Sequence, residues 1–275
     1  MLLAIDVGNT NTVLGLYRLA TPEAPALQAH CWRIATPVQR TLDELRMVLR
    51  GLFIMDGVDI ASVTGVAVSS VVPPIDSLFR EVIEKLFGVK PLFVEPGVKT
   101  GLPVLVDNPA EVGADRIVNC VAAFERYGGP TIVVDLGTAT TFDVISQRGE
   151  YLGGAIAPGI GISADALFER AAKLGRVNIR KPGKVIGTNT VDHIQIGLYY
   201  GYIGLVDGIC ERMIAELATE TKVIATGGFA RMLAETSRTI RHVDDNLTLD
   251  GVRLIYERNQ DRVRRRAMAT TQRPE

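Results

Sequence analysis

Several common features are scarce in this chain of 275 residues, and each scarcity excludes a class of protein. The formal net charge is only −1, so the chain has no overall positive field that would hold nucleic acid. It contains no apolar run of about 18 residues and no basic, cleavable leader, so neither membrane insertion nor secretion is expected. These absences predict a cytoplasmic protein whose partner is a small molecule, with no nucleic acid and no membrane.

Cysteine is also scarce. The three cysteines, Cys31, Cys120 and Cys210, are far apart, lie in apolar contexts and show no Cys-x-x-Cys spacing. Neither a disulfide framework nor a zinc site is therefore indicated, and the three are expected to be buried, reduced thiols. A hydrophobic content of 47% with 22% charged residues describes a well-cored protein, long enough for two domains of about 130 residues.

The most informative stretch follows an apolar run and reads Asp6-Val7-Gly8-Asn9-Thr10-Asn11-Thr12. It returns in altered form as Asp135-Leu136-Gly137-Thr138-Ala139-Thr140-Thr141. In each copy an apolar strand delivers a carboxylate, then a glycine that lets backbone amides approach an anion, then hydroxyls that can donate to phosphate oxygens. Each turn leads into another strand, whereas the turn of a Walker loop or a Rossmann fold opens a helix. One such turn would be typical of an ordinary hairpin, but two predict a duplicated phosphate-handling fold.

The rest of the pattern predicts an α/β protein with a mixed sheet in each half. Strands are expected at 2–6, 12–18, 29–35, 63–68, 131–135, 140–146, 150–156 and 222–226. Helices are expected after the capping box at Thr41, over 75–87, from Asn108 to about Tyr127, and over 191–217. The expected domains are an N-terminal lobe over 1–127, a C-terminal lobe over 128–257 and a flexible basic tail over 258–275.

Asp115 is the candidate general base. The helix expected after Asn108 places it on a partly apolar face, where a carboxylate should lose solvation and become a stronger base. Its neighbour Arg116 would reach an anionic or hydroxylated substrate, although an isolated Asp and Arg on a helix more often form an ordinary surface ion pair. Asp6 and Asp135 suit the binding of cations, since Mg²⁺ commonly arrives with a nucleotide.

With these residues in view, the chain resembles the type III pantothenate kinases over nearly its whole length. The segment Asp6–Thr10 matches the first phosphate motif of that family, Asp135–Thr141 the second, and Gly113-Ala114-Asp115-Arg116 the substrate motif. Thr226-Gly227-Gly228 resembles the adenosine motif, and Thr188-Asn189-Thr190 a segment that touches pantothenate. The resemblance implies two ribonuclease-H-like lobes of the actin-like ATPase fold, a homodimer, and the first committed step of coenzyme A synthesis.

The resemblance also implies a role for each matching position. The nucleotide would be held by Asp6, Val7, Gly8, Asn9, Thr10, Asn11, Thr12, Val13 and Thr138. Pantothenate would be held by Gly113, Ala114, Asp115, Arg116 and Thr190, with Asp115 as proton acceptor. Asp135 would bind a monovalent cation, K⁺ or NH₄⁺, besides the Mg²⁺ that accompanies ATP.

One position departs from the family. Val106 stands where many members place an aromatic residue that lines the pantothenate pocket. Two alternatives also stay open at this point. One is a kinase or phosphatase of the same superfamily that acts on a sugar or a carboxylic acid, because a fold does not fix a substrate. The other is an ATP-binding transcriptional accessory protein, although such a protein would not need a base.

Overall fold

The computed structural model describes residues 1–21, 23–171 and 174–271, with side chains as far as residue 260. The chain forms two compact units, which are described separately below. The first unit contains Met1–Gly101, Ala110–Ala122 and the chain from Thr248 onward. The second contains Leu102–Pro109 and Ala123–Leu247. This division differs from the lobes expected from the sequence, which place a boundary after Tyr127 and assign residues 248–257 to the second lobe.

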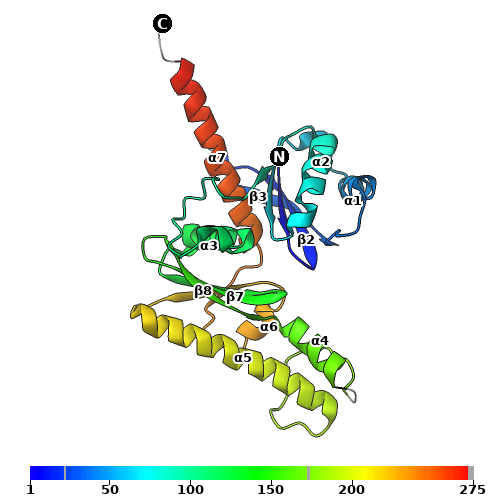
Figure 1. Ribbon diagram of the computed structural model, residues 1–275, viewed down its shortest axis with the longest axis vertical. Helices are drawn as coiled ribbons and strands as arrows, with labels where there is room; N and C mark the ends of the chain where they lie inside the picture. The colour runs from blue at the N-terminus through cyan, green and yellow to red at the C-terminus, as the bar shows by residue number, and fades with distance from the viewer. Residues whose placement is uncertain (22, 172–173, 272–275) are drawn as a thin grey trace. The chain divides into compact units, whose positions relative to one another are not determined.

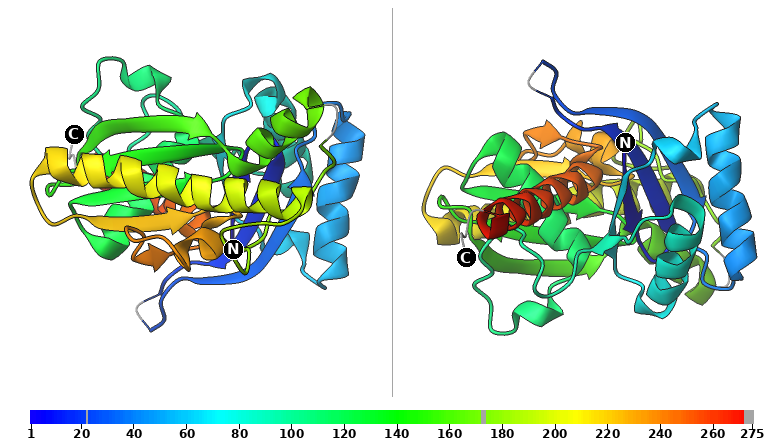
Figure 2. Two further views of the ribbon diagram at one scale, coloured as in Figure 1. Left: turned by 90° about the horizontal axis from the view of Figure 1, so that it is seen from below. Right: turned by 90° about the horizontal axis from the view of Figure 1, so that it is seen from above.

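The first unit is built on a five-stranded sheet in the order β3-β2-β1-β4-β5. Its strands are β1 (Leu2–Val7), β2 (Asn11–Arg18), β3 (Leu27–Ala35), β4 (Gly65–Ser70) and β5 (Leu92–Phe93). The first three are antiparallel, and β4 runs parallel to β1. The apolar side chains of β1, β2 and β4 pack against α1 (Leu42–Met55) and α2 (Asp76–Phe87), which lie side by side (Figure 2). Short 3₁₀ turns, Ile60–Ser62 and Pro73–Ile75, precede β4 and α2.

The second unit repeats this plan. Its strands are β6 (Thr131–Leu136), β7 (Ala139–Ile145), β8 (Tyr151–Pro158), β9 (Lys222–Thr226) and β10 (His242–Val243). Their order is β10-β9-β6-β7-β8, again with three antiparallel strands followed by parallel ones. The core of this unit lies between the sheet and its helices α4 (Ile160–Arg170), α5 (Thr190–Leu217) and α6 (Ala230–Ala234), and Figure 1 shows α5 lying along the sheet. The matching strand orders confirm the duplication predicted from the two Asp-x-Gly turns.

The last helix, α7 (Leu247–Thr271), explains why the end of the chain belongs to the first unit. Thr248 Oγ1 donates to Asn119 Oδ1 at 2.7 Å, which ties α7 to α3 (Ala114–Tyr127). The two helices approach so closely at Gly251 that a Cβ there would lie 1.9 Å from the Val118 carbonyl oxygen. The helix continues through most of the expected tail over 258–275, while residues 272–275 lie outside the described part of the chain.

The cysteine prediction is correct for two of the three residues. All three are free thiols, and Cys120 and Cys210 are buried; burial raises the pKa of the Cys210 thiol to about 12. Cys31, however, is exposed. It lies on β3 next to Trp32, whose side chain joins the core, and successive side chains of a strand point to opposite faces. An apolar neighbour on a strand therefore does not imply burial.

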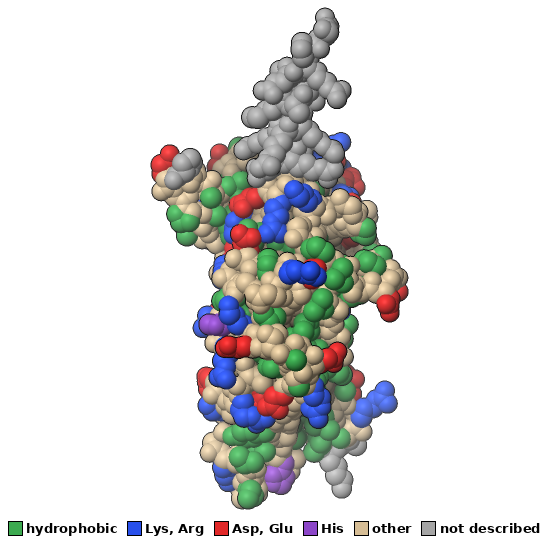
Figure 3. All heavy atoms as spheres, turned by 90° about the vertical axis from the view of Figure 1, so that its left-hand side faces the viewer, with side chains coloured by type: hydrophobic (Ala, Val, Ile, Leu, Met, Phe, Trp, Pro, Cys, Tyr) green, Lys and Arg blue, Asp and Glu red, His purple; other side chains and the backbone are tan. Residues whose placement is uncertain are grey.

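The surface carries charges of both signs. On the face shown in Figure 3, Lys and Arg side chains are interspersed with Asp and Glu and with apolar groups. This mixture accords with the net charge of −1. Among the helices in the described ranges, none combines the length and the hydrophobicity needed to cross a membrane.

Candidate active site

The first phosphate turn is the hairpin between β1 and β2. Asp6 is half-buried near the end of β1 and pairs with Val13 across the ladder, while Val7 pairs with Thr12. Gly8 N donates to the Asn11 carbonyl at 3.0 Å and closes the turn. Asn9, Thr10 and Asn11 are exposed at its tip. The hairpin therefore presents polar groups at the carboxyl end of a buried strand.

Thr36, directly after β3, forms hydrogen bonds to this hairpin. Its hydroxyl donates to the Gly8 carbonyl, and its backbone N donates to the Thr10 carbonyl at 3.0 Å. The hydroxyl also lies 3.3 Å from that of Thr12, which is fully buried. Thr12 thus holds the shape of the turn and does not face solvent, unlike Thr10.

The substrate motif lies at the same edge of the first unit. The Val7 carbonyl, at the end of β1, accepts a hydrogen bond from Val71 N at 3.1 Å. Gly113 lies against Val71, since a Cβ on Gly113 would be 3.5 Å from Val71 Cγ1. Contacts through Val71 therefore bring the segment that carries Asp115 next to the end of the strand that carries Asp6.

The prediction of one continuous helix from Asn108 to Tyr127 is wrong. The structure has a 3₁₀ turn over Pro109–Glu111 and a separate helix, α3, that begins at Ala114. Gly113 stands at the break, where a Cβ would lie 2.6 Å from Asp115 Oδ1. A glycine at this position therefore leaves room for the carboxylate, which a longer side chain would displace.

Because of this break, Asp115 occupies the first turn of α3 and not the middle of a helix. Its Oδ1 accepts a hydrogen bond from the backbone N of Arg116 at 2.7 Å. Asp115 and Arg116 are both half-buried. A helix N-terminus favours negative charge, so it stabilises the carboxylate, opposing the desolvation expected from the sequence. The carboxylate is the form that accepts a proton.

The second phosphate turn is the hairpin between β6 and β7. Asp135 is half-buried near the end of β6, Gly137 N donates to the Ala139 carbonyl at 3.1 Å, and Thr138 is exposed at the tip. The Thr138 carbonyl accepts from Gly159 N, the N-cap of α4, at 3.1 Å. A Cβ on Gly159 would lie 2.2 Å from that oxygen, so only glycine allows α4 to begin against the turn.

Two glycines lie close to the Asp135 carboxylate. A Cβ on Gly137 would lie 3.5 Å from Asp135 Oδ1, and one on Gly227 would lie only 2.6 Å from it. Gly227 follows β9, whose Thr226 pairs with Asp135. A carboxylate oxygen is a ligand that hard cations prefer. Among the described residues no group of three or more His, Cys, Asp or Glu side chains is placed to hold a metal.

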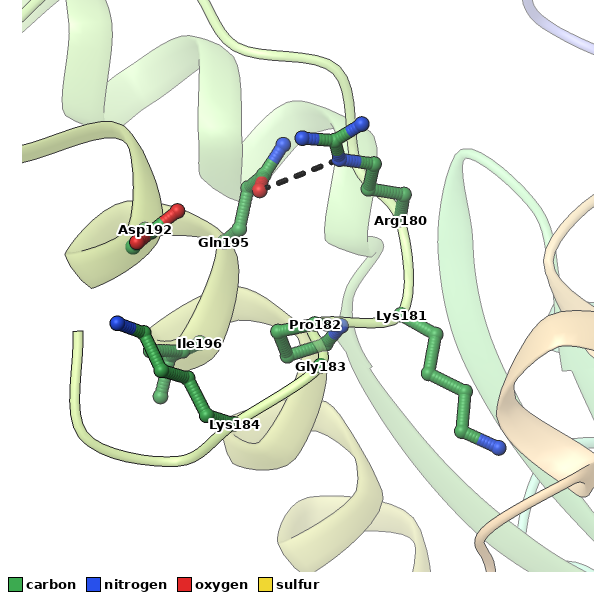
Figure 4. Close-up of a pocket in the computed structure, with 8 residues that line it drawn as sticks. All are labelled: Arg180, Lys181, Pro182, Gly183, Lys184, Asp192, Gln195 and Ile196. Atoms are coloured by element: carbon green, nitrogen blue, oxygen red, sulfur yellow. Dashed lines mark hydrogen bonds between the residues drawn. The ribbon is translucent and has the colours of Figure 1, made fainter.

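Thr190 is the exposed first residue of α5, and Asn189 caps that helix by accepting from Asp192 N at 2.9 Å. A pocket of about 360 Å³ lies next to this cap (Figure 4). Its basic side chains are Arg180, Lys181 and Lys184, and its lining also includes Asp192, Gln195 and Ile196. Arg180 Nε donates to Gln195 Oε1 at 3.4 Å, and Lys181 Nζ pairs with Glu235 at 3.1 Å.

A second pocket of about 500 Å³ begins beside the Gly227-Gly228 turn. Phe229, directly after the two glycines, lines it together with Phe168 and Ala164 of α4. Phe229 N reaches back to the Leu136 carbonyl at 3.4 Å. The second phosphate turn and a pocket lined by two aromatic rings and by polar side chains therefore adjoin each other within this unit. The sequence alone pointed to the two glycines before Phe229 but not to the two aromatic rings that line this pocket.

Three kinds of similarity place the chain among known proteins. The sequence profile of the family described as type III pantothenate kinase matches residues 2–212. A type III pantothenate kinase from Koribacter versatilis is 58% identical over 97% of this chain and 98% of its own length. One from Anaeromyxobacter sp. strain Fw109-5 is 60% identical over 94% of this chain and 100% of its own.

Solved structures agree on the fold. A Campylobacter jejuni protein of the Baf family of transcriptional activators superposes with a TM-score of 0.60 over 94% of this chain and 99% of its own, at 18% identity. An ethanolamine utilization protein from Carboxydothermus hydrogenoformans gives 0.51 over 92% and 89%, at 15% identity. At such identities the likeness shows the fold alone, an α/β fold of the actin-like ATPase and sugar kinase type. By sequence, the chain belongs to the type III pantothenate kinase family.

Proposed function

We propose that this protein transfers the γ-phosphoryl group of ATP to pantothenate, giving 4′-phosphopantothenate and ADP, the first step of coenzyme A biosynthesis. The observation that carries this proposal is family membership over nearly the whole chain, combined with Asp115 at a helix N-terminus beside a phosphate turn. The reaction is proposed to take place in the cytoplasm, and the protein is proposed to act as a homodimer.

The nucleotide is assigned to the two hairpins. The segment Asp6–Val13 would contact the phosphates through its backbone and its exposed side chains, and Thr138 would add a contact from the second turn. The exposed tips of both hairpins, at Asn9–Asn11 and Thr138, support this assignment. Phosphoryl transfer requires that the phosphates be held and their charge neutralised, and Mg²⁺ bound to ATP would supply that neutralisation.

Pantothenate is assigned to Gly113–Arg116 and Thr190. Its primary hydroxyl would attack the γ-phosphorus, so that a new O–P bond forms while the bond between the γ-phosphorus and the bridging oxygen breaks and ADP leaves. Asp115 would accept the hydroxyl proton, and its place in the first turn of α3 favours the carboxylate form that does so. Arg116 adds a fixed positive charge that orients the substrate.

The monovalent cation is assigned to Asp135. Its carboxylate supplies an oxygen ligand of the kind that hard cations prefer, and neither Gly137 nor Gly227 places a side chain against it. When bound, K⁺ or NH₄⁺ would supply positive charge that offsets the repulsion between Asp135 and the ATP phosphates.

The test is ATP-dependent phosphorylation of pantothenate, simple sugars and acetate, each with and without K⁺ at fixed Mg²⁺ and ionic strength. We expect turnover with pantothenate only. Turnover of a sugar or of acetate with none of pantothenate would contradict the proposal and favour another kinase of the superfamily. ATP binding without turnover of any acceptor would instead favour the accessory-protein alternative.

A further inference from the structure

Asp143 is a carboxylate with no exposed surface in the middle of β7. A buried charge is costly unless hydrogen bonds satisfy it. Two hydroxyls do so here: Tyr151 Oη donates to Asp143 Oδ1 at 2.9 Å, and Thr141 Oγ1 donates to Asp143 Oδ2 at 3.2 Å. In both hydrogen bonds the hydroxyl is the donor and an oxygen of Asp143 is the acceptor, so both hydroxyl protons point at Asp143.

The hydrogen bond to Asp143 determines whether the Thr141 hydroxyl can donate or only accept toward its other neighbours. Thr141 pairs with Asp135 across the ladder between β6 and β7, and side chains of directly opposite residues lie on the same face of a sheet. Because its proton is committed to Asp143, the Thr141 oxygen has only lone pairs left to offer on that face. Donating to a charged acceptor also makes a hydroxyl oxygen a better acceptor or ligand in turn.

Two residues without side chains lie next to the Asp135 carboxylate. The Asp135 Oδ1 atom faces Gly227, where a Cβ would approach it to 2.6 Å, and Gly137, where the distance would be 3.5 Å. K⁺ is coordinated in proteins mainly by neutral oxygens that replace its hydration shell. A threonine oxygen held with its lone pairs beside a carboxylate is a ligand of this type.

We propose that Thr141 Oγ1 is a second ligand of the monovalent cation at Asp135, and that the buried pair Asp143 and Tyr151 acts as a positioning device for it. This inference rests on the proposed function, which assigns the cation to Asp135. Thr141 would contact the cation directly, while Asp143 and Tyr151 would only hold the Thr141 hydroxyl in its orientation. Removing a residue that hydrogen-bonds to a metal ligand commonly changes the metal affinity by about 10- to 100-fold.

The first experiment measures cation binding without relying on turnover. The melting temperature of the full chain with Mg²⁺ and a non-hydrolysable ATP analogue is followed as KCl replaces choline chloride at constant ionic strength. We expect K⁺ to stabilise the wild type, and Thr141→Val to raise the half-effective KCl concentration by about 10-fold or more. Thr141→Ser keeps the hydroxyl and should stay close to the wild type.

Thr140→Val is the matched control. Thr140 is the neighbouring β7 residue, its buried hydroxyl has no hydrogen-bond partner, and it points to the opposite face of the sheet. Thr140→Val therefore removes a threonine hydroxyl without changing any side chain on the sheet face that carries Asp135. An equal KCl response in the wild type, Thr141→Val and Thr140→Val would overturn the assignment of Thr141.

The second experiment tests the positioning device. In Asp143→Asn the amide oxygen would accept from Tyr151, so the amide nitrogen would donate to Thr141 and turn the Thr141 proton toward the cation. We therefore expect a large rise in the half-effective KCl concentration, with the KM for pantothenate little changed. Tyr151→Phe keeps the Thr141 bond and should give a smaller rise. If Asp143→Asn melts lower but keeps the wild-type KCl response, Asp143 is a core residue only.

The wild type separates this inference from the proposed function. A wild type that phosphorylates pantothenate and responds to K⁺, while Thr141→Val responds equally, overturns the ligand assignment alone. A wild type that phosphorylates pantothenate but shows no K⁺ response overturns both cation assignments and leaves the proposed reaction standing.

Discussion

Substituting Gly227 by alanine is expected to be strongly destabilising and to disturb the cation site. Gly227 has a φ of +92°, in the region that residues with a side chain rarely adopt. A Cβ there would lie 2.6 Å from Asp135 Oδ1 and 2.7 Å from the Leu136 carbonyl oxygen. One of these obstacles is backbone that pairs within the sheet, so it cannot move away cheaply.

The magnitude follows from the two costs together. Strain from an unfavourable φ is about 1–3 kcal/mol, and overpacking a filled site is also about 1–3 kcal/mol. Their sum, about 2–6 kcal/mol, corresponds to a fall in melting temperature on the order of 10 °C for a chain of this size. The displaced Asp135 carboxylate should also raise the KCl concentration needed for half-maximal activity.

The assay compares Gly227→Ala with Gly228→Ala by thermal melting and by KCl titration of activity. Gly228 is the matched control, because it is exposed and a Cβ there would have no atom within 4 Å. The substitution Gly228→Ala should change the free energy of unfolding by about 0.5 kcal/mol or less. If the two variants melt within 2 °C of each other, roughly the effect of 1 kcal/mol or less, the steric reasoning is refuted.

Three further predictions concern the assigned residues. Asp115→Asn should keep the fold and nucleotide binding but lower kcat by about 10²-fold or more in steady-state assays, and near-normal turnover of a folded variant would remove Asp115 from the base role. Asp135→Ala should abolish most of the rate together with its dependence on K⁺, whereas equal wild-type rates in K⁺, Na⁺ and Tris would count against that assignment. Val106 is half-buried, with Cγ1 3.7 Å from the Cβ position of Gly153. An aromatic ring at this position would add an apolar wall for pantothenate, so Val106→Tyr should lower the KM for pantothenate and leave the KM for ATP nearly unchanged. A lowered melting temperature with unchanged or weaker pantothenate binding would show instead that the ring overpacks the site.

Elements with strong local signals were predicted well. The capping box at Thr41 is present, with Glu44 and Thr41 satisfying each other's backbone groups, and α1 begins at the next residue. The strand expected over 222–226 has those bounds, and the helix expected over 191–217 begins one residue earlier. Such elements depend on hydrophobic periodicity and on caps that are written into neighbouring residues.

Elements whose course depends on distant contacts were predicted less well. The helix expected after Asn108 is interrupted at Gly113, where the Asp115 carboxylate and Val71 occupy the adjoining space. The helical course of the residues after Arg258 was also missed, because that segment lacks apolar periodicity of its own. At Gly113 one of the two neighbouring groups, Val71, lies outside any sequence window that a periodicity argument covers.

The sequence by itself determined the duplicated strand-turn-strand plan and the family, because both are carried by local motifs: a carboxylate, a glycine and hydroxyls at fixed spacing after an apolar strand. Only the tertiary structure decided which side chains meet around those motifs. Asp143 follows Phe142 in an apolar strand and carries no signal of a role, yet the pairing of β7 with β6 and β8 brings Asp135, Thr141 and Tyr151 to its face of the sheet. The physical reason is that strand register, which places side chains of distant segments opposite one another, is fixed by the whole sheet and its core and not by any one strand.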